Sequence, residues 1–503
     1  MVRSDHFFGR AAADEAACRA RNRSRADILA TECGSQTSPG KYWRVTNDAY
    51  DFSMSAFSVP RTLVVNFNAP ELNNLALELA HLGQLASYVR PYANKRRWWE
   101  RALAATPLAG AAYGSTFGRR LIQDEALAQR TFESGVFPDV LAAITLRLSL
   151  LPDGRRRLWT NRFIKSLRES VAQAATRFVD AADCVVAYEG FALPAFQALR
   201  AGGKGRTVLN YPVAHHRVRR RERLEEIERQ PLFASTWPDF DDWPAGHEER
   251  LDEEIRMADA VWVGSTYAAD SFVAEGVARE RMQVIPYGVD LAMFHPPSPG
   301  DVARQETRKF TAIYAGQLTQ RKGLSYLLEG YRQFARPDSQ LILVGSGVGD
   351  PRALAPHAHL FRHTAHQTRA ELARLYRSSD VFVFPTLVEG MPLVVLEAMA
   401  CGLPVIVTAN GPADIVRDGI DGFVIPSRDA GAVARCLDEL RRRPELRREM
   451  GRNASRRAAE FGWAAYTAKA TAALSELCRP ATHVSPGSDG VDAFMPLGAS
   501  AAS

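Results

Sequence analysis

The chain has 503 residues, of which 46% are hydrophobic and 24% charged, and its net charge is +6. This composition is typical of a soluble globular protein with two or three domains. No apolar run reaches the ~20 residues of a membrane-spanning helix, and the first residues lack the apolar core of a signal peptide. The six cysteines show no CxxC pair and no zinc spacing. The sequence predicts a cytoplasmic protein, or one peripheral on the cytoplasmic face of the inner membrane.

Both ends of the chain differ in composition from the middle. Residues 1–60 alternate charged, small and polar side chains with little period, which predicts a poorly ordered N-terminal extension. Residues 479–503 are rich in Pro, Gly, Ser and Ala, which predicts a disordered tail.

The residues between these ends form two α/β blocks. The first block opens with a strand at Thr62–Phe67 and a helix over 71–82 that ends at Gly83. Its later strands are predicted at 184–188, 206–210, 260–263 and 282–286, with helices notably over 155–181 and 247–258. The second block has predicted strands at Phe310–Ala315, 341–345, 359–363, 381–384, 405–408 and 423–425.

The regular alternation of strands and helices indicates parallel sheets with right-handed crossovers. Residues 287–309 are rich in Pro and Gly and read as a linker between the blocks. The sequence therefore predicts an N-terminal Rossmann-like domain over 61–290, a C-terminal one over 291–460, and a last helix over 461–478.

Residues 381–408 carry the most informative pattern: strand, loop, helix, turn and strand. Pro392 suits the first helical turn, where its missing N–H costs nothing. The free N–H groups of Gly390, Met391 and Leu393 would form an anion site at the helix N-terminus. Glu389 precedes that site, and Glu397 lies inside the helix, about 7 Å along its axis. A nucleotide sugar, with hydroxyls on both sides of a diphosphate, suits this layout.

This segment resembles the Glu-x7-Glu motif of retaining glycosyltransferases with the GT-B fold, in particular family 4 (glycosyl transferases group 1). The resemblance implies two Rossmann-like, doubly wound parallel-sheet domains of α/β class that face each other across a cleft. It implies that Glu389 contacts the donor sugar and Glu397 the ribose of the nucleotide. It also implies that the last helix, over 461–478, crosses back onto the N-terminal domain.

A second segment adds positive charge beside the expected diphosphate. Gly316 allows a tight turn after the strand at 310–315, and Arg321 and Lys322 follow at the carboxyl end of that strand, where α/β sheets bind ligands. Two cations there would neutralise charge on a leaving diphosphate. The family often has Arg at the position of Gln317, and Arg321 stands in for it here. The alternative is a solvated helix start with surface cations.

The glycines of Val344–Asp350 resemble part of a dinucleotide fingerprint, but Pro351 follows them and residues 351–370 contain no acid. A nicotinamide or flavin cofactor is therefore rejected. No cofactor and no metal are expected, because in this fold a helix dipole and cations take the place of the metal.

The N-terminal domain is expected to bind the acceptor. The segment 207–217 resembles the one that carries the family's first-domain histidine, which is His215 by position, with His216 as the less favoured choice. A neutral imidazole can donate and accept hydrogen bonds, as sugar hydroxyls require. The alternative is a histidine at a loop surface. Further acceptor-side candidates follow predicted strands, namely Glu189, Glu71, Asn73 and Asn74.

Two basic stretches, Lys95–Glu100 and Arg217–Arg223, favour an anionic membrane or a phosphate-bearing acceptor. The alternative is a pair of solvated helix faces. Nucleic acid is excluded as a partner because no supporting module is present.

The prediction is thus a retaining, metal-independent glycosyltransferase that moves a sugar from a UDP- or GDP-sugar to a hydroxyl of a glycan, lipid-linked or small-molecule acceptor by front-face displacement. Two alternatives stay open at this point: an epimerase-like GT-B enzyme and a non-catalytic nucleotide-sugar-binding subunit. A phosphorylase-like enzyme is disfavoured, because no segment matches the lysine that would bind its cofactor.

Overall fold

The computed structural model describes residues 59–106, 120–147, 153–237, 246–297, 309–347, 349–365 and 367–479. The predicted N-terminal extension and C-terminal tail lie outside these residues, except at their inner edges. All of the described elements belong to one compact unit.

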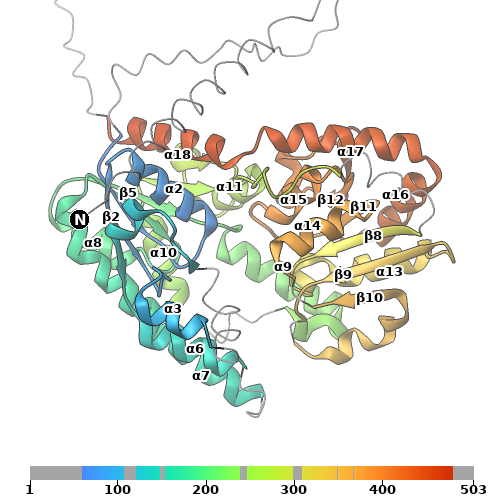
Figure 1. The fold of residues 1–503 in the computed structure, drawn as a ribbon, viewed down its shortest axis with the longest axis horizontal. Coiled ribbons are helices and arrows are strands. Elements are labelled where there is room, and N and C mark those ends of the chain that lie inside the picture. The colour runs from blue at the N-terminus through green and yellow to red at the C-terminus, as the bar shows by residue number, and fades with distance from the viewer. Residues whose placement is uncertain are drawn as a thin grey trace, which may run out of the picture. The chain divides into compact units, whose positions relative to one another are not determined.

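The first sheet has seven parallel strands in the order β3-β2-β1-β4-β5-β6-β7 (Figure 1). The strands are β1 (Thr62–Val65), β2 (Leu85–Arg90), β3 (Thr131–Glu133), β4 (Cys184–Tyr188), β5 (Arg206–Asn210), β6 (Ala260–Val263) and β7 (Met282–Val284). Its α-helices are α2 (Pro70–His81), α3 (Trp98–Ala104), α5 (Glu125–Arg130), α6 (Val136–Arg147), α7 (Asp153–Ala175), α8 (Leu193–Ala201), α9 (His216–Arg229), α10 (His247–Met257) and α11 (Thr266–Val273). We call this sheet with its helices the N-terminal domain.

The second sheet has six parallel strands in the order β10-β9-β8-β11-β12-β13. The strands are β8 (Phe310–Ala315), β9 (Ser339–Val344), β10 (Phe361–Thr364), β11 (Val381–Phe384), β12 (Val405–Thr408) and β13 (Gly422–Ile425). Its α-helices are α13 (Leu324–Phe334), α14 (Arg369–Arg377), α15 (Leu393–Ala400), α16 (Ala430–Arg442) and α17 (Pro444–Ala459). We call this sheet with its helices the C-terminal domain.

Short 3-10 turns complete both domains. They are η2 (Thr176–Ala181), η3 (Pro231–Thr236), η4 (Arg279–Arg281), η6 (Gln320–Lys322), η7 (Pro351–Ala353), η8 (Ala355–Leu360) and η9 (Pro412–Asp414). Of these, η3 and η6 matter most for the site, because a backbone N–H at the start of η6 bonds to the last residue of η3.

The predicted fold class is confirmed: both sheets are parallel, and both are interleaved with helices. The central strands of both sheets are almost entirely buried, as parallel strands covered on two faces must be, whereas the edge strands β3, β7, β10 and β13 are partly exposed. Strands β2 and β3 were not predicted from the sequence. β2 contains Ser87 and Arg90 and so lacks a continuous apolar run, and β3 has only three residues.

The last helix, α18 (Trp463–Leu477), packs against α2 of the N-terminal domain. The backbone N–H of Val289 donates to the carbonyl of Phe461 over 2.8 Å. The rings of Tyr287 and Tyr466 meet edge to face, with their centroids 6.3 Å apart. The segment that leads into the C-terminal domain and the segment that returns from it therefore contact each other.

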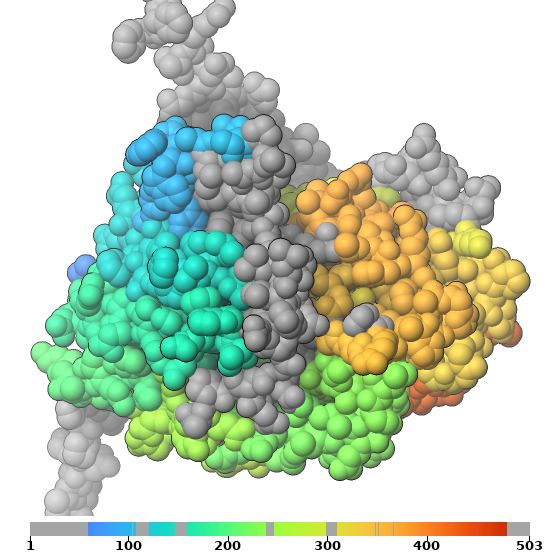
Figure 2. Space-filling model, turned by 90° about the horizontal axis from the view of Figure 1, so that it is seen from below, coloured from blue at the N-terminus to red at the C-terminus, as the bar shows by residue number. Residues whose placement is uncertain are grey.

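One helix of the N-terminal domain lies against the C-terminal domain. Figure 2 shows the green atoms of α9 and η3 beside the orange atoms of the second half of the chain. Hydrogen bonds cross this boundary, among them Gln320 Nε2 to Glu226 over 2.7 Å and the amide of Gln320 to Thr236 over 2.9 Å. Among the described residues, no helix has both the length and the apolar character needed to cross a membrane.

Candidate active site

The loop between β11 and α15 carries the predicted anion site. Pro392 stands at the N-cap with an extended backbone, one residue before the helix starts, and no side chain caps the helix there. Within the described part of the chain, no hydrogen bond uses the amides of Gly390, Met391 or Leu393. The positive end of the helix is therefore available to a negatively charged ligand.

Close packing holds this loop against the N-terminal domain. A β-carbon on Gly390 would overlap the carbonyl oxygen of Pro212, so only glycine fits there. The Ser265 hydroxyl donates to the carbonyl of Gly390 over 2.6 Å. The backbone N–H of Tyr287 lies 3.0 Å from the sulfur of Met391. The predicted donor-binding loop thus lies where the two domains meet.

The side chains of Glu389, Arg321 and Lys322 form one buried cluster. Arg321 Nη1 donates to Glu389 Oε1 over 2.6 Å and to the carbonyl of Val388 over 2.8 Å, and the Lys322 ammonium contacts the same carboxylate. Arg321 and Lys322 are only 19% and 12% exposed at their side chains, so they do not project into open solvent. The structure brings together the three residues that the sequence analysis placed beside the diphosphate.

Two effects act on the charge of Lys322. Burial and the neighbouring Arg321 guanidinium lower its pKa, whereas direct contact with the Glu389 carboxylate favours the ammonium form. In the ammonium form that this contact favours, Lys322 gives the cluster two positive charges and one negative charge.

Glu397 lies on α15 and is buried, with Arg369 Nη2 donating to Oε1 over 3.2 Å. Burial raises the pKa of Glu397 to about 7; Asp290 adds to that shift, and Arg369 opposes it. The sequence analysis missed Arg369, since one arginine on an amphipathic helix gives no signal by itself.

The glycines after β8 and β9 shape the adjoining wall. Gly316 has a φ of 143°, and a β-carbon on Gly345 would overlap the carbonyl oxygen of Gly316. The Tyr314 hydroxyl donates to the carbonyl of Gln317 over 2.6 Å. The two glycine loops therefore pack directly on each other at the carboxyl edge of the sheet.

On the N-terminal side, His215 caps helix α9. Its Nδ1 accepts a hydrogen bond from the backbone N–H of Arg217 over 3.2 Å, and the backbone N–H of His215 donates to the hydroxyl of Ser271 over 2.8 Å. Burial, and then His216, lower the pKa of His215 to about 3. The imidazole is neutral, and its Nε2 carries the proton. His215 is thus a hydrogen-bond donor at Nε2.

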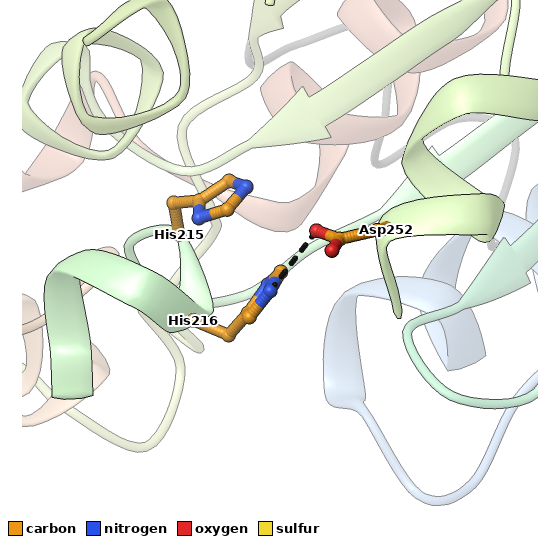
Figure 3. Close-up of side chains that lie close together, drawn as sticks. All are labelled: His215, His216 and Asp252. Atoms are coloured by element: carbon orange, nitrogen blue, oxygen red, sulfur yellow. Dashed lines mark ion pairs between the residues drawn. The ribbon is translucent and has the colours of Figure 1, made fainter. Parts of the chain in front are cut away.

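His216 extends toward α10, with its ring stacked on that of His215 at 4.2 Å between the centroids. Figure 3 shows its ring directed at Asp252, and His216 Nε2 lies 3.1 Å from Asp252 Oδ1. Its Nδ1 lies 3.3 Å from the hydroxyl of Tyr211. Burial and the neighbouring arginines lower the pKa of His216 to about 3. The structure therefore gives the two histidines different surroundings.

The ligand atoms of His215, His216 and Asp252 lie within 4.8 Å of one another, a spacing that invites comparison with a metal site. The donor chemistry does not fit a cation, because Nδ1 of His215 already accepts an amide and Nε2 must then keep its proton. Arg217 Nη2 also lies 2.5 Å from Asp252 Oδ2. The cluster is better described as a hydrogen-bonded helix start.

Three of the acceptor-side candidates join polar contacts at the carboxyl edge of the first sheet. Arg219 Nη2 lies 3.4 Å from Glu189, and Asn210 donates to Glu71 over 3.1 Å. Asn73 contacts the Tyr88 hydroxyl and accepts from Arg90 over 3.2 Å. Burial raises the pKa of Glu71 to about 6.

The fourth candidate, Asn74, does not join them, because its side chain donates back to the carbonyl of Pro70 over 2.8 Å. The side chains of Arg90 and Arg219 were missed. Arg219 follows His215 by four residues, and the buried residues of α9 recur at helical spacing, namely His216, Arg219, Arg223 and Glu226. That helical spacing could have indicated a buried face, but the many charged residues of the segment suggested an exposed helix instead.

With two parallel Rossmann-like domains and this site between them, the protein has the GT-B fold. Anabaena HepE, solved in complex with UDP-glucose, superposes with a TM-score of 0.54 at 15% identity over 83% of this chain and 100% of that one. Sucrose-phosphate synthase from Thermosynechococcus elongatus gives 0.52 at 19% identity, over 83% and 98%. At such identities these similarities establish the fold alone.

Residues 301–457, the C-terminal domain, match the family model described as "Glycosyl transferases group 1". The D-inositol 3-phosphate glycosyltransferase of Frankia alni is 34% identical over 209 residues, which is 37% of this chain and 51% of that protein. The enzyme of the same name from Paenarthrobacter aurescens is 32% identical over 238 residues, or 42% and 57%. The chain spans about half the length of the curated relatives that it matches.

Proposed function

We propose that this protein is a retaining, metal-independent glycosyltransferase of family 4 that transfers a sugar from a UDP- or GDP-sugar to an acceptor hydroxyl. The cluster of Glu389, Arg321 and Lys322 beside the N-terminus of α15 carries this proposal. The match to group 1 glycosyltransferases and the names of the relatives support it. The UDP-glucose in the HepE title favours UDP as the nucleotide.

In the proposed mechanism the diphosphate lies against the amides of residues 390–393, and Glu397 binds the ribose. Arg321 and Lys322 exchange part of their contact with Glu389 for contacts with the phosphates. The Glu389 carboxylate is then able to orient the sugar. The protonated Nε2 of His215 donates to a sugar hydroxyl. Each group is held before the reaction starts, so little reorganisation is needed.

The proposed chemical step is front-face displacement. The bond between the anomeric carbon and the leaving phosphate oxygen breaks, and the acceptor oxygen forms its bond on the same face. The acceptor proton passes to the leaving phosphate oxygen, so no side chain acts as base. The two cations stabilise the charge that grows on the diphosphate, and closure of the domains excludes water.

The acceptor is proposed to lie on the N-terminal domain, near Glu189, Glu71 and Asn73. A glycan, a lipid-linked sugar and a small molecule all fit the proposal. The relatives' name supports a small-molecule acceptor, because it specifies inositol 3-phosphate. Arg90 and Arg219 at this edge would suit an acceptor that bears negative charge.

Thermal-shift screening with UDP, GDP, ADP and their sugars tests the nucleotide. Glu389→Ala and Lys322→Ala should each lower turnover on the order of 100-fold, because each removes preorganised charge. Lys204→Ala, an exposed lysine of the N-terminal domain, is the control. Near-normal turnover in either site variant would remove that residue from the proposed site.

Product analysis separates the alternatives. An epimerase-like enzyme would convert the donor alone into its epimer, and a non-catalytic binding subunit would leave the donor unchanged in the presence of every acceptor. A transferase releases free nucleotide in step with acceptor glycosylation. The buried cation pair against Glu389 favours the transferase.

Association with anionic membrane is a separate proposal about localisation, on the cytoplasmic face. It now rests on the first basic stretch, where Trp98 is 76% exposed beside exposed Arg96. Arg97 of the first stretch pairs with Glu100 and Glu133, so Arg96 and Trp98 carry the proposal. In the second stretch Arg217, Arg220 and Arg221 each pair with an acid of the same domain.

A further inference from the structure

Helix α9 reaches from the histidine side of the site to the turn that carries the cation pair. Its first residue is His216, and its last full turn contains Glu226, which is 1% exposed. Glu226 Oε1 accepts from Gln320 Nε2 over 2.7 Å, and Oε2 accepts from Arg428 Nε over 2.9 Å. Both carboxylate oxygens of Glu226 are therefore bonded to residues of the C-terminal domain.

Gln320 is the residue directly before Arg321 and Lys322 and opens the turn η6. Its side chain binds Ser325 twice, at 2.6 Å and 3.0 Å, and its backbone N–H donates to Thr236 over 2.9 Å. Contacts from α9 and α13 thus meet at the side chain of Gln320, and η3 holds its backbone N–H. A shift of α9 along its axis would therefore strain or break the bond between Glu226 and Gln320.

The end of η6 has little freedom to adjust. Gly323 has a φ of 71°, and a β-carbon there would overlap the carbonyl oxygen of Pro385. The backbone N–H of Leu387 donates to the carbonyl of Arg321 over 2.9 Å. The turn η6 is therefore held at Gln320 on one side and at Arg321 and Gly323 on the other.

Arg428 completes the arrangement from the loop after β13. It also pairs with Glu222 over 2.6 Å, and it adopts a φ of 65°, a left-handed backbone that residues other than glycine rarely adopt. Two carboxylates of α9 hold the residue in that conformation. The contact between α9 and the C-terminal domain is therefore specific in geometry as well as in charge.

We propose that Glu226 is a positioning residue: through Gln320, helix α9 of the N-terminal domain sets the turn that aims Arg321 and Lys322. This inference rests on the proposed function for its effect on turnover, but the positioning itself is a property of the free protein. Glu226 touches no substrate; it acts through Gln320. The state of the acceptor-side domain is thereby coupled to the charge that stabilises the leaving diphosphate.

The experiment compares Glu226→Ala with Glu222→Ala. Both remove a carboxylate from Arg428, and only Glu226 bonds to Gln320. Hydrogen exchange is followed at the amides of 320–323 in the protein without ligand. Glu226→Ala should speed exchange there about tenfold, the factor expected when a hydrogen bond to a charged group is lost. Glu222→Ala should change it less than about twofold.

Steady-state kinetics with a UDP-sugar donor provides the second measurement. Glu226→Ala and Gln320→Ala should each lower kcat about tenfold with KM within about twofold, since the cations act mainly on the transition state. The double variant should be no worse than either single variant, because both break one link. Glu226→Gln keeps an oxygen that can accept from Gln320, so it should restore most of the rate.

Multiplicative losses in the double variant, or equal effects of Glu226→Ala and Glu222→Ala on exchange, would overturn the inference. So would a Glu226→Gln variant as slow in turnover and as fast in exchange as Glu226→Ala. If the wild-type protein transfers no sugar, the proposed function fails, and the exchange comparison still decides the positioning role. If Glu226→Ala does not fold, Gln320→Ala and Glu226→Gln supply the same comparison.

Discussion

Replacing Gly323 by alanine is the most direct perturbation of the turn that carries the cation pair. Gly323 ends η6 with a φ of 71°, and the added β-carbon would overlap the backbone carbonyl of Pro385 at the end of β11. A backbone oxygen cannot move aside as a flexible side chain can. The substitution must therefore separate η6 from β11, and with it Arg321 and Lys322 from Glu389.

A matched control separates backbone strain from this displacement. Gly419 has a φ of 72°, but nothing lies within 4 Å of its added β-carbon. The left-handed backbone alone costs about 1 to 2 kcal/mol in either variant. Overpacking against a fixed neighbour adds about 1 to 3 kcal/mol. Gly323→Ala should thus lower the free energy of unfolding by about 2 to 5 kcal/mol, and Gly419→Ala by about 1 to 2 kcal/mol.

Urea unfolding measures these free energies, and turnover with a UDP-sugar measures the effect on the site. A misplacement of about 1 Å in a catalytic group costs roughly 100-fold in rate, so Gly323→Ala should be far slower than Gly419→Ala even when both are folded. Equal stability and equal turnover in the two variants would refute the view that η6 is fixed by contact with β11.

Three further predictions concern other parts of the proposed site. The pKa of Glu397 is about 7 in the folded protein, against 4.5 for an unperturbed glutamate. Its contribution to the free energy of unfolding is therefore complete below about pH 4.5 and is lost as the pH rises through 7. If the carboxylate binds ribose, affinity for UDP-glucose by calorimetry should rise about tenfold from pH 6 to pH 8; a Glu397→Gln variant with the same rise would contradict this. EDTA should leave transfer intact, and a loss that Mg²⁺ or Mn²⁺ restores would show a metal requirement. Trp98→Ala should weaken sedimentation with phosphatidylserine vesicles at low salt, whereas Arg221→Ala should not; equal binding by both variants and wild type would exclude the first basic stretch.

The strands and helices of the C-terminal domain were predictable because the residues within and next to each one indicate where it begins and ends. The strand at 381–384, the glycine after it and the helix beginning near 393 have their apolar period, their cap and their turn within one segment. The spacing of Glu389 and Glu397 follows from that segment alone. The same reasoning could not show that Arg321 and Lys322 lie against Glu389, because that contact joins residues 67 and 68 positions apart.

The basic stretch at 217–223 shows where local reasoning ends. A run of arginines favours solvent or an anionic surface only if no acids approach it. In the folded chain Glu189, Glu248 and Glu275 supply them from other elements. The sequence distance between these partners is 28 to 54 residues for the pairs that bond with Arg219, Arg220 and Arg221. The charge pattern indicated a surface, and in the fold Arg217, Arg220 and Arg221 keep half or more of their side chains exposed but pair with acids of the same domain.

Pairing with distant charged residues also explains why α9, a helix of the N-terminal domain, is bonded to the C-terminal domain. A helix that carried only apolar residues on its buried face could slide against a neighbour, since dispersion contacts have little directional preference. Glu222 and Glu226 instead meet Arg428 through bonds of fixed direction, and Glu226 meets Gln320 as well. Buried charged contacts contribute little net stability but penalise any arrangement that leaves one partner alone. The register of α9 against η6 is therefore defined by the free energy that a misaligned arrangement would cost, and the proposed role of the two cations at a diphosphate requires such a constraint.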